Sequence, residues 1–404
     1  MNAVGIDVSK GKSMVAILRP YGEVVLPPFE IEHTDRHIAQ LAALIKSLDG
    51  ETRVVMEYTG SYHAPVSHRL YNAGIFVCVV NAKLVHDYAN NSLRRAKTDK
   101  KDAIKLANYA LDHWATLPAW YPEEEARALL KSCYRQYGEY AKVQTMLKNN
   151  LISVLDLTFP NLNRLFTSAR RVGGTEKWVD FAYTFWHSRC VSSMTEEEFA
   201  AVYRDWCDGK GYRFSYDKAV AVHQAASTNT GVVQPSGTME LLVRHAAQQL
   251  RNAHLTMGRL AEQMTMLASL LPEYGVVMGM FGVGETLGPQ LMAEIGDVRR
   301  FRSKRALVAF AGIDVPPYQS GTVDLHSRSI SKRGSASLRR TLFLVMSGIL
   351  QNAPENEPVY AYMAQKRSEG KPYRVYMMAA ANKFLRIYYA RVTEHLRRLE
   401  EEFE

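Results

Sequence analysis

The sequence predicts an α/β domain at the amino terminus, followed by a mainly helical remainder, and three observations support this division. Short apolar runs alternate with turn residues and helical patterns over residues 1–115, as in a sheet covered by helices. Two long segments then repeat apolar residues at steps of three and four, the spacing of a coiled-coil seam. The region from Tyr274 onward combines a glycine turn with further helical patterns. We therefore predict domains at residues 1–115, 116–273 and 274–404.

In the α/β domain, short apolar and β-branched runs predict strands, and longer periodic stretches predict helices. The expected strands are residues 3–6, 14–18, 23–26, 53–56 and 75–80, and the expected helices are residues 34–48, 62–72 and 98–111. Thr98 has the side chain and the position of a helix N-cap. The helix-breaking pair Thr59-Gly60 follows the fourth strand, so Glu57 is placed at the carboxyl end of a strand.

Four acidic side chains stand out in this domain because of the positions that they take. Asp7 follows the first strand, in VGIDVSK, and Glu57 ends the fourth, in RVVMEYTG. Asp99 and Asp102, in TDKKDA, lie three residues apart at the start of a helix and share one helix face. Ligand and metal sites favour the carboxyl edge of an α/β sheet. The quartet therefore predicts the metal site of a nuclease of the RNase H type.

The chemistry of the quartet follows from its charge. Carboxylates that are brought together repel one another unless a cation neutralises them, and Mg²⁺ prefers oxygen ligands. Two such ions about 4 Å apart can activate a nucleophile and stabilise the leaving oxygen of a phosphodiester. We therefore predict Mg²⁺ or Mn²⁺, and phosphoryl transfer on nucleic acid. Each residue alone has a simpler interpretation, as a turn former or part of a solvated helix face; their order along the chain favours the metal site.

The composition narrows the class of protein. The chain has 404 residues and a formal net charge of +9, which favours polyanionic partners. Its four cysteines show no CxxC spacing, which argues against a disulfide framework and a structural zinc site. No run of 18 apolar residues appears, and the first twenty residues have the pattern of strands. We therefore expect a cytoplasmic protein with no membrane partner.

Basic residues gather in three clusters. These are Arg94, Arg95 and Lys97; Arg299, Arg300, Arg302, Lys304 and Arg305; and Arg328, Lys332, Arg333, Arg339 and Arg340. A basic cluster is usually a solvated surface, but three of them flanking the predicted chemistry suit contacts to phosphate. We therefore predict that members of all three clusters bind nucleic acid.

Two apolar seams predict a pair of long helices. The first seam runs from Leu130 to Val154 and has Gln144 as its polar interruption, and the second runs from Val243 to Leu271. The two helices are expected to pair as an antiparallel coiled coil within one chain, or between two subunits.

The segment between the two seams, residues 159–237, is rich in aromatic residues. We interpret it as a small helical insertion whose aromatic side chains pack a core. Stacking of these rings on bases is the alternative. The Ser, Thr, Asn, Gly and Pro residues of 226–237 predict a linker.

The carboxy-terminal region begins with a Gly-Val-Gly turn, Gly282 to Gly284, that leads into a helix. It lacks the strand, the further glycine and the downstream acidic residue of a nucleotide-cofactor fingerprint. A helix-hairpin-helix-like turn fits better, because its exposed amides can hold a nucleic-acid phosphate. A tight turn between packed helices is the alternative.

Ser320 precedes Gly321 in a proline-bearing loop with basic residues on either side. A Ser-Gly pair by itself indicates a turn. No GxSxG elbow surrounds Ser320, and no His/Asp partner can be assigned from spacing, which argues against ordinary acyl-transfer chemistry.

Two regions together resemble one family, the DEDD transposases of bacterial insertion sequences known as the IS one-ten family, which are bridge-RNA-guided recombinases. The motifs VGIDVSK, MEYTG and TDKKDA resemble its amino-terminal RuvC-like signature. The block from GVGETLGPQLMAEIG to VPPYQSG, with SKRGSASLRR after it, resembles its carboxy-terminal transposase domain. The two regions cover about half of the chain.

The resemblance implies a role for each of the singled-out residues. Asp7, Glu57, Asp99 and Asp102 would form the metal-binding tetrad, and Ser320 would attack DNA and form a transient phosphoserine link. A structured guide RNA, the bridge RNA, would specify donor and target DNA. The resemblance also implies a homo-oligomer, a dimer assembling to a tetramer, in which the RuvC-like domain meets the transposase domain of another subunit, in the bacterial cytoplasm and on the nucleoid when bound to DNA.

Two other functions stay open at this point. One is a RuvC-like junction nuclease that uses only the four carboxylates. The other is a non-catalytic protein that binds DNA or RNA and keeps the fold for recognition.

Overall fold

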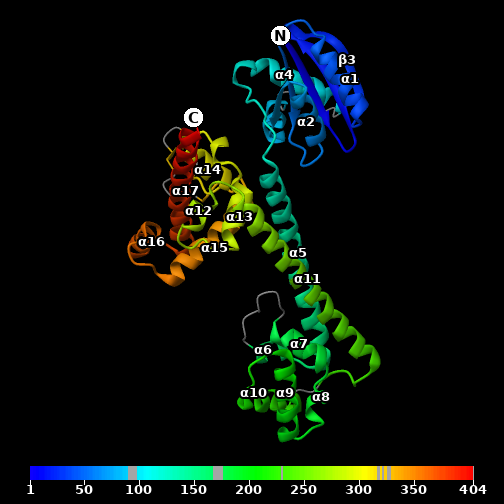
Figure 1. The fold of residues 1–404 in the computed structure, drawn as a ribbon, viewed down its shortest axis with the longest axis vertical. Helices are drawn as coiled ribbons and strands as arrows, with labels where there is room; N and C mark the ends of the chain where they lie inside the picture. The colour runs from blue at the N-terminus through cyan, green and yellow to red at the C-terminus, as the bar shows by residue number, and fades with distance from the viewer. Residues whose placement is uncertain are drawn as a thin grey trace. The chain divides into compact units, whose positions relative to one another are not determined.

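The computed structural model describes residues 1–89, 98–166, 176–228, 231–315, 319–320, 323–324 and 329–403. The chain forms two compact units, an amino-terminal unit of residues 1–123 and a carboxy-terminal unit of residues 124–404 (Figure 1). The further division of the carboxy-terminal unit into two domains, near residue 273, stays a prediction. None of the described helices is long and apolar enough to cross a membrane.

The amino-terminal unit is built on a five-stranded sheet in the order β3-β2-β1-β4-β5. The strands are β1 Asn2–Val8, β2 Lys12–Arg19, β3 Glu23–Glu32, β4 Thr52–Glu57 and β5 Phe76–Val80. β2 runs antiparallel to both β1 and β3, whereas β4 runs parallel to β1 and β5. This mixed sheet confirms the predicted α/β domain and all five predicted strands.

β3 is longer than predicted, because it continues through Pro27 and Pro28 to Glu32. Proline cannot donate a hydrogen bond to a neighbouring strand and is tolerated on edge strands and at bulges. Both conditions hold here. β3 is an edge strand, and its register against β2 shifts between Val15 and Leu18.

Helices cover both faces of this sheet. They are α1 Asp35–Lys46, α2 Ala64–Asn72, α3 Ala82–Ala89 and α4 Asp99–Asp112, with 3-10 turns at Pro20–Gly22 and Trp114–Thr116. α1 and α2 pack on one face and α3 and α4 on the other. Thr98 caps α4 as predicted, since its hydroxyl accepts a hydrogen bond from the Lys101 amide at 3.4 Å. α3 was not predicted; the Asn81 side chain begins it by accepting from the Lys83 amide.

Gly5 of β1 lets α4 lie unusually close to the sheet. A Cβ atom at this position would overlap the Ala103 carbonyl oxygen and the Ala107 amide nitrogen, and would lie 3.0 Å from the Leu106 Cβ. Two of these atoms belong to the backbone of α4 and cannot rotate away. The absence of a side chain at Gly5 therefore sets the distance between α4 and β1.

The carboxy-terminal unit is organised around two long helices, α5 Glu125–Thr158 and α11 Gly237–Ser269, which lie side by side (Figure 1). Leu130 near the start of α5 packs with Met264 near the end of α11, and Leu151 packs with Val243. The two helices are therefore antiparallel and pair within one chain, which is the first of the two predicted arrangements.

The polar interruption in the first seam is explained by a partner on α11. Gln144 lies 2.7 Å from the imidazole Nε2 of His254, which is buried. A buried polar pair inside an apolar seam is satisfied in one alignment of the two helices only. It therefore fixes how far α5 and α11 can slide along each other.

The segment between these helices is a small helical insertion, as predicted. Its helices are α6 Leu162–Leu165, α7 Lys177–Thr184, α8 Arg189–Ser192, α9 Glu196–Lys210 and α10 Tyr216–Thr228. Phe181, Phe185 and Tyr203 are buried in its core, and the rings of Phe181 and Phe185 stack at 4.6 Å. Because these three rings are buried, they cannot stack on bases. For them the prediction of an aromatic core is confirmed.

The predicted linker at 226–237 was too long. Ala226 to Thr228 belong to α10, and Gly237 already begins α11. The Ser236 hydroxyl caps α11 by accepting a hydrogen bond from the Met239 amide. Because Ser236 caps α11, the helix begins inside the segment that was predicted as a linker, and the irregular stretch is shorter than predicted.

The region after α11 is mainly helical, as predicted. It contains α12 Tyr274–Met278, α13 Leu287–Ile295, α14 Lys304–Ala311, α15 Ala336–Asn352, α16 Pro358–Ser368 and α17 Tyr373–Phe403, a 3-10 turn at Val298–Arg300, and the short strands β6 Gln319–Ser320 and β7 Val323–Asp324. Their core is continuous with the apolar residues at the start of α5 and the end of α11.

A buried ion pair joins the start of α5 to the start of α12. The Arg127 guanidinium donates two parallel hydrogen bonds to the Glu273 carboxylate, one of them of 2.9 Å. The two side chains are only 4% and 1% exposed. The Arg127 Nε also lies 3.2 Å from the carboxylate of Glu124, which is exposed. Removal of Glu273 therefore takes away the buried partner of the guanidinium and leaves it the more exposed one.

Glu273→Ala is therefore expected to lower the free energy of unfolding by about 3–5 kcal/mol. Glu369→Ala is the control, because its salt bridge with Lys366 on α16 is more exposed and its loss should have a much smaller effect on the free energy of unfolding. Denaturation in urea measures both. Replacement of both Arg127 and Glu273 by Leu should recover most of the loss. Equal effects of the two single alanine variants would contradict this account.

Candidate active site

Asp7 and Glu57 lie at the carboxyl ends of two neighbouring parallel strands. β1 and β4 pair in parallel up to the residues immediately before them. Side chains alternate between the two faces of a sheet. Gly5 and Val55, two residues earlier in each strand, face α4. Asp7 and Glu57 therefore lie side by side on the face that α4 covers.

The direction of α4 brings Asp99 and Asp102 to the same edge. After its last turn, the Trp114 carbonyl accepts a hydrogen bond from Arg53 at the amino end of β4. The first turn of α4 therefore lies toward the carboxyl ends of the strands. The charge of Asp99 also acts on Lys12, which begins β2 beside that end of β1.

Both helical carboxylates also belong to the side of α4 that faces the sheet. Residues four apart share one helix face. Ala103 and Leu106, four residues after Asp99 and Asp102, are fully buried against the sheet. All four predicted acidic residues are thus directed to one edge and one face of the sheet.

Two lysines compensate part of the negative charge at this edge. The Lys105 ammonium lies 2.9 Å from the Asp102 carboxylate, and Lys12 lies 2.8 Å from Glu30. The hydrogen bond and charge of Glu30 raise the pKa of Lys12, and Asp99 adds a smaller contribution in the same direction. Neither lysine was predicted as part of the site; the β1–β2 turn brings Lys12 to this edge.

Comparison with known proteins supplies the deciding observation. Residues 4–160 match the profile of a family described as transposase, of the DEDD class of IS110, and residues 274–360 match that of the transposase IS116/IS110/IS902 family. The chain belongs to the IS110 family of transposases. This transposase is therefore an enzyme of the DNA transposase and recombinase class, and the predicted RuvC-like, RNase H-type fold of its first domain is confirmed by the family and by the strand order.

Several relatives share most of its length. A protein of Streptomyces coelicolor named as the insertion element IS110 uncharacterized 43.6 kDa protein is 22% identical over 387 residues, covering 96% of this chain and 93% of the relative. The pilin gene-inverting protein of Moraxella bovis is 23% identical over 343 residues, or 85% of this chain and 80% of the relative.

A solved structure, T. thermophilus RuvC in complex with a Holliday junction substrate, aligns with a TM-score of 0.25 and 13% identity, over 30% of this chain and 99% of RuvC. At that TM-score the fold assignment rests on the strand order and the family rather than on this likeness.

Transposases of the DEDD class and RuvC-like nucleases generally use divalent metal ions, so we asked whether the carboxylates of this transposase fit one. The donor chemistry fits, because four carboxylates supply the hard oxygen ligands that Mg²⁺ prefers. Within the part of the chain that the structure describes, no three His, Cys, Asp or Glu side chains are close enough to hold a metal ion. The fold places the four carboxylates at one edge of the sheet, and their role as metal ligands stays a prediction.

Ser320 lies in the carboxy-terminal unit of the transposase, at the end of β6. It pairs in antiparallel register with Val323 of β7. The predicted nucleophile is therefore part of a short hairpin. The prolines that precede this hairpin, and Gly321, lie outside the described residues.

The Gly-Val-Gly turn of the transposase joins α12 to α13, as predicted, but its first glycine is required by packing. Gly282 has a φ of +79°, and a Cβ there would lie 2.6 Å from the Ile349 Cγ1 and 3.1 Å from the Val345 carbonyl oxygen on α15. This matches the alternative of a tight turn between packed helices. Gly284 is exposed, and a Cβ there would meet no atom within 4 Å, so a phosphate contact at this residue stays a prediction.

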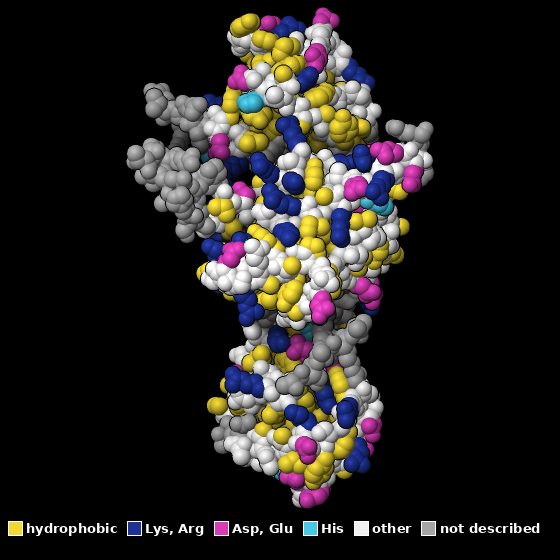
Figure 2. Space-filling model, turned by 90° about the vertical axis from the view of Figure 1, so that its left-hand side faces the viewer, with side chains coloured by type: hydrophobic (Ala, Val, Ile, Leu, Met, Phe, Trp, Pro, Cys, Tyr) yellow, Lys and Arg dark blue, Asp and Glu magenta, His cyan; other side chains and the backbone are white. Residues whose placement is uncertain are grey.

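The predicted basic residues of the transposase differ in their surroundings. Lys and Arg side chains are more widespread than Asp and Glu on the face shown in Figure 2. Arg302, Lys304, Lys332, Arg333 and Arg340 are exposed. Arg94, Arg95, Lys97 and Arg328 lie outside the described residues.

Arg339 is already engaged within the protein. Its guanidinium donates to the carbonyl oxygens of Ala311 at 2.9 Å and Gly334 at 3.2 Å. These bonds tie α15 to the end of α14. A structural role for Arg339 is therefore evident beside the predicted contact to nucleic acid.

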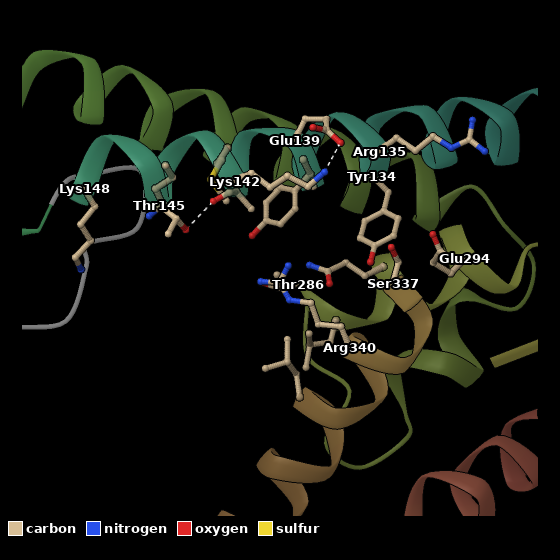
Figure 3. Close-up of a pocket in the computed structure, with 18 residues that line it drawn as sticks. Tyr134, Arg135, Glu139, Lys142, Thr145, Lys148, Thr286, Glu294, Ser337 and Arg340 are labelled. Carbon is tan, nitrogen blue, oxygen red and sulfur yellow. Dashed lines mark hydrogen bonds and ion pairs between the residues drawn. The ribbon is translucent and has the colours of Figure 1, made fainter. Parts of the chain in front are cut away.

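A cleft of about 550 Å³ between α5, α13 and α15 was missed by the sequence analysis. Figure 3 shows Tyr134 on α5, Thr286 and Glu294 near α13, and Ser337 and Arg340 on α15 around this space. The lining residues run from Tyr134 to Leu344, 210 positions apart in the sequence, so no local pattern marks the cleft. Two lining residues were named from the sequence, Gln144 as the polar interruption of the first seam and Arg340 as a member of a basic cluster. Of these two, Arg340 was predicted to contact nucleic acid.

Proposed function

We propose that this transposase cuts DNA strands and rejoins them to new partners, at donor and target sites that a structured guide RNA specifies. The placement of Asp7, Glu57, Asp99 and Asp102 at one edge of the sheet carries this proposal. Four carboxylates converge in this way at little benefit to folding, because like charges repel, but with clear benefit to phosphoryl transfer.

In this proposal the four carboxylates hold Mg²⁺ or Mn²⁺. Asp7 and Glu57 are presented by rigid neighbouring strands, and Asp99 and Asp102 by the first turn of α4. Bound ions would neutralise the phosphate and lower the barrier to attack by a hydroxyl. Lys105 and Lys12 would limit the repulsion between the carboxylates when no metal is bound.

Ser320 is the proposed nucleophile. Its Oγ forms a bond to the phosphorus of the DNA backbone, the bond from phosphorus to one deoxyribose oxygen breaks, and the serine proton passes to that leaving oxygen. The reverse reaction, with a deoxyribose hydroxyl from the other DNA, releases the serine and joins the strands. The covalent link conserves the energy of the phosphodiester, so no ATP is needed.

The relatives favour rejoining over simple cutting. Those from Moraxella are named for inverting a pilin gene, and a DNA segment cannot be inverted unless its cut ends are rejoined. The net charge of +9 suits the polyanionic partners, DNA and RNA. The exposed basic residues Arg302, Lys304, Lys332 and Arg333 and the turn glycine Gly284 would contact their phosphates, together with Arg94, Arg95 and Lys97. RNA guidance and assembly as dimers or tetramers in the cytoplasm, on the nucleoid, rest on the family resemblance.

Ser320→Ala is expected to abolish both the covalent protein–DNA adduct and strand rejoining, because alanine has no hydroxyl to attack phosphorus. The assay uses purified protein, Mg²⁺, guide RNA and end-labelled donor and target DNA, with adducts resolved on a denaturing gel. Ser329→Ala, an exposed serine nearby in the chain, is the control and should keep wild-type activity. Normal rejoining by Ser320→Ala would show that the serine mechanism is wrong.

The same assay separates the other two functions. A junction nuclease that needs only the carboxylates would cut equally well as Ser320→Ala. A non-catalytic binding protein would neither cut nor form an adduct with wild-type Ser320. Sequencing of RNA that copurifies with the protein tests the guide; recovery of no discrete RNA would remove that part of the proposal.

A further inference from the structure

The cleft between α5, α13 and α15 has the shape of a site for an extended ligand. Its lining on α5 runs from Tyr134 to Lys148, which at 1.5 Å per residue is about 21 Å. A stacked single strand of nucleic acid rises about 3.4 Å per nucleotide, so this length spans about six nucleotides. A volume of about 550 Å³ is in the range of small-ligand sites and is too small for a double helix.

The charge of the lining suits an anion. Arg135, Lys142, Lys148 and Arg340 line the cleft against two acidic residues, Glu139 and Glu294. Lys142 pairs with Glu139 and Lys148 with Glu176. Arg340 has no ion pair or hydrogen bond with the described residues, and Figure 3 shows its side chain extending from α15 toward the space below α5. An unpaired guanidinium in a cleft is the side chain best suited to bind phosphate.

Polar and aromatic groups complete the lining. Thr286 and Ser337 supply hydroxyls, and Gln290, which is 7% exposed, supplies an amide whose oxygen accepts from Thr341. Tyr137 is a half-buried ring in the same lining. Base–aromatic stacking with hydrogen bonding to the backbone is the usual composition of a single-strand site.

Gly138 gives a second, independent observation. It lies in the interior of α5, where glycine costs up to about 1 kcal/mol relative to alanine, and it lines the cleft. A Cβ at Gly138 would meet no atom within 4 Å, so packing within the chain does not require glycine here. Glycine in such a place lets a ligand approach the backbone closely.

We propose that this cleft binds one strand of nucleic acid, with a phosphate at Arg340 and the strand passing over Gly138. The inference rests on the proposed function, because strand exchange separates DNA strands and a guide RNA presents unpaired bases. The shared chemistry is a single-stranded phosphodiester, and DNA and RNA are its two sources.

The test measures binding without catalysis, by fluorescence anisotropy of the full chain with labelled 12-nucleotide single-stranded DNA, the same RNA, and the DNA duplex. Gly138→Phe fills the cleft and is expected to weaken single-strand binding at least about tenfold, with thermal stability unchanged or raised. Gly138→Ala, which leaves the cleft open, should bind as the wild type does.

Arg340→Gln is expected to weaken single-strand binding about fivefold and to lower the slope of log affinity against log salt by about 0.7, the value for one phosphate contact on a single strand. Arg391→Gln is the control, because it removes the same charge from an exposed position on α17 outside the cleft. A larger effect on DNA identifies the exchanged strand as the occupant, and a larger effect on RNA identifies the guide; either supports the cleft.

Three results would overturn the inference. They are wild-type binding by both Gly138→Phe and Arg340→Gln, an equal loss of duplex binding, and a change of oligomeric state in Gly138→Phe, which would show that a second copy covers this face. The proposed function fails separately, if Ser320→Ala rejoins strands normally, because the binding measurements do not depend on catalysis.

Discussion

Asp7→Asn and Glu57→Gln are each expected to slow strand exchange at least about 10³-fold while leaving nucleic-acid binding nearly unchanged. Each replacement keeps the shape of the side chain and removes the negative charge that a divalent ion requires. Loss of about 4 kcal/mol of charge stabilisation in the transition state corresponds to a factor of about 10³ in rate. Recombination of labelled DNA measures the rate, and anisotropy measures binding.

Asp49→Asn is the matched control for this prediction. Asp49 is exposed and precedes β4, at the opposite end of the strand that Glu57 ends. The same loss of charge at that end should leave the rate within about twofold of the wild type. Normal recombination by Asp7→Asn would falsify the assignment of the tetrad. Partial rescue of Glu57→Gln by Mn²⁺ in place of Mg²⁺ would strengthen it.

Gly5→Ala is expected to destabilise the amino-terminal unit by about 3 kcal/mol and to stop strand exchange, although it removes no ligand. The added Cβ overlaps backbone atoms of α4 at Ala103 and Ala107, so α4 must move away from the sheet. That movement carries Asp99 and Asp102 away from Asp7 and Glu57. Packing and chemistry are therefore coupled through one missing side chain.

Hydrogen exchange of the α4 and β1 amides measures this effect in the unit where it arises. Exchange should be faster in Gly5→Ala than in the wild type. Gly209→Ala is the control, because a Cβ at that exposed position of α9 meets no atom within 4 Å. It should leave exchange and activity unchanged. Full activity of Gly5→Ala would show that α4 need not be held at its present distance from β1.

The elements that the sequence predicts well are those with strong periodicity. The strands around Asp7 and Glu57 and the two long helices follow from alternation and from heptad spacing. The elements that were missed depend on short capping bonds or on pairing between distant segments. α3 begins at an Asn81 side-chain hydrogen bond, and the second half of β3 forms despite two prolines because β2 pairs with it.

The candidate site likewise has features that the sequence predicts and features that it does not. The residue types and the edge that they occupy are predictable, because strand ends and a capped helix start can be located locally. The spacing of the four carboxylates is set by how closely α4 packs on Gly5, which no local pattern encodes. The cleft between α5, α13 and α15 is even less predictable from local sequence, since it arises only when Gly138 and Arg340 are brought together from different helices.

The two prolines of β3 have a consequence for crowding on DNA. Copies of a transposase that gather on one DNA molecule reach high local concentrations, and exposed sheet edges then tend to pair edge to edge. Pro27 and Pro28 lie in this edge strand and carry no amide hydrogen, so neither can donate a hydrogen bond to a further strand. The register shift twists the edge further. Pairing of this edge with the sheet of another copy is thereby disfavoured, and the amino-terminal unit is protected from open-ended aggregation through its strands.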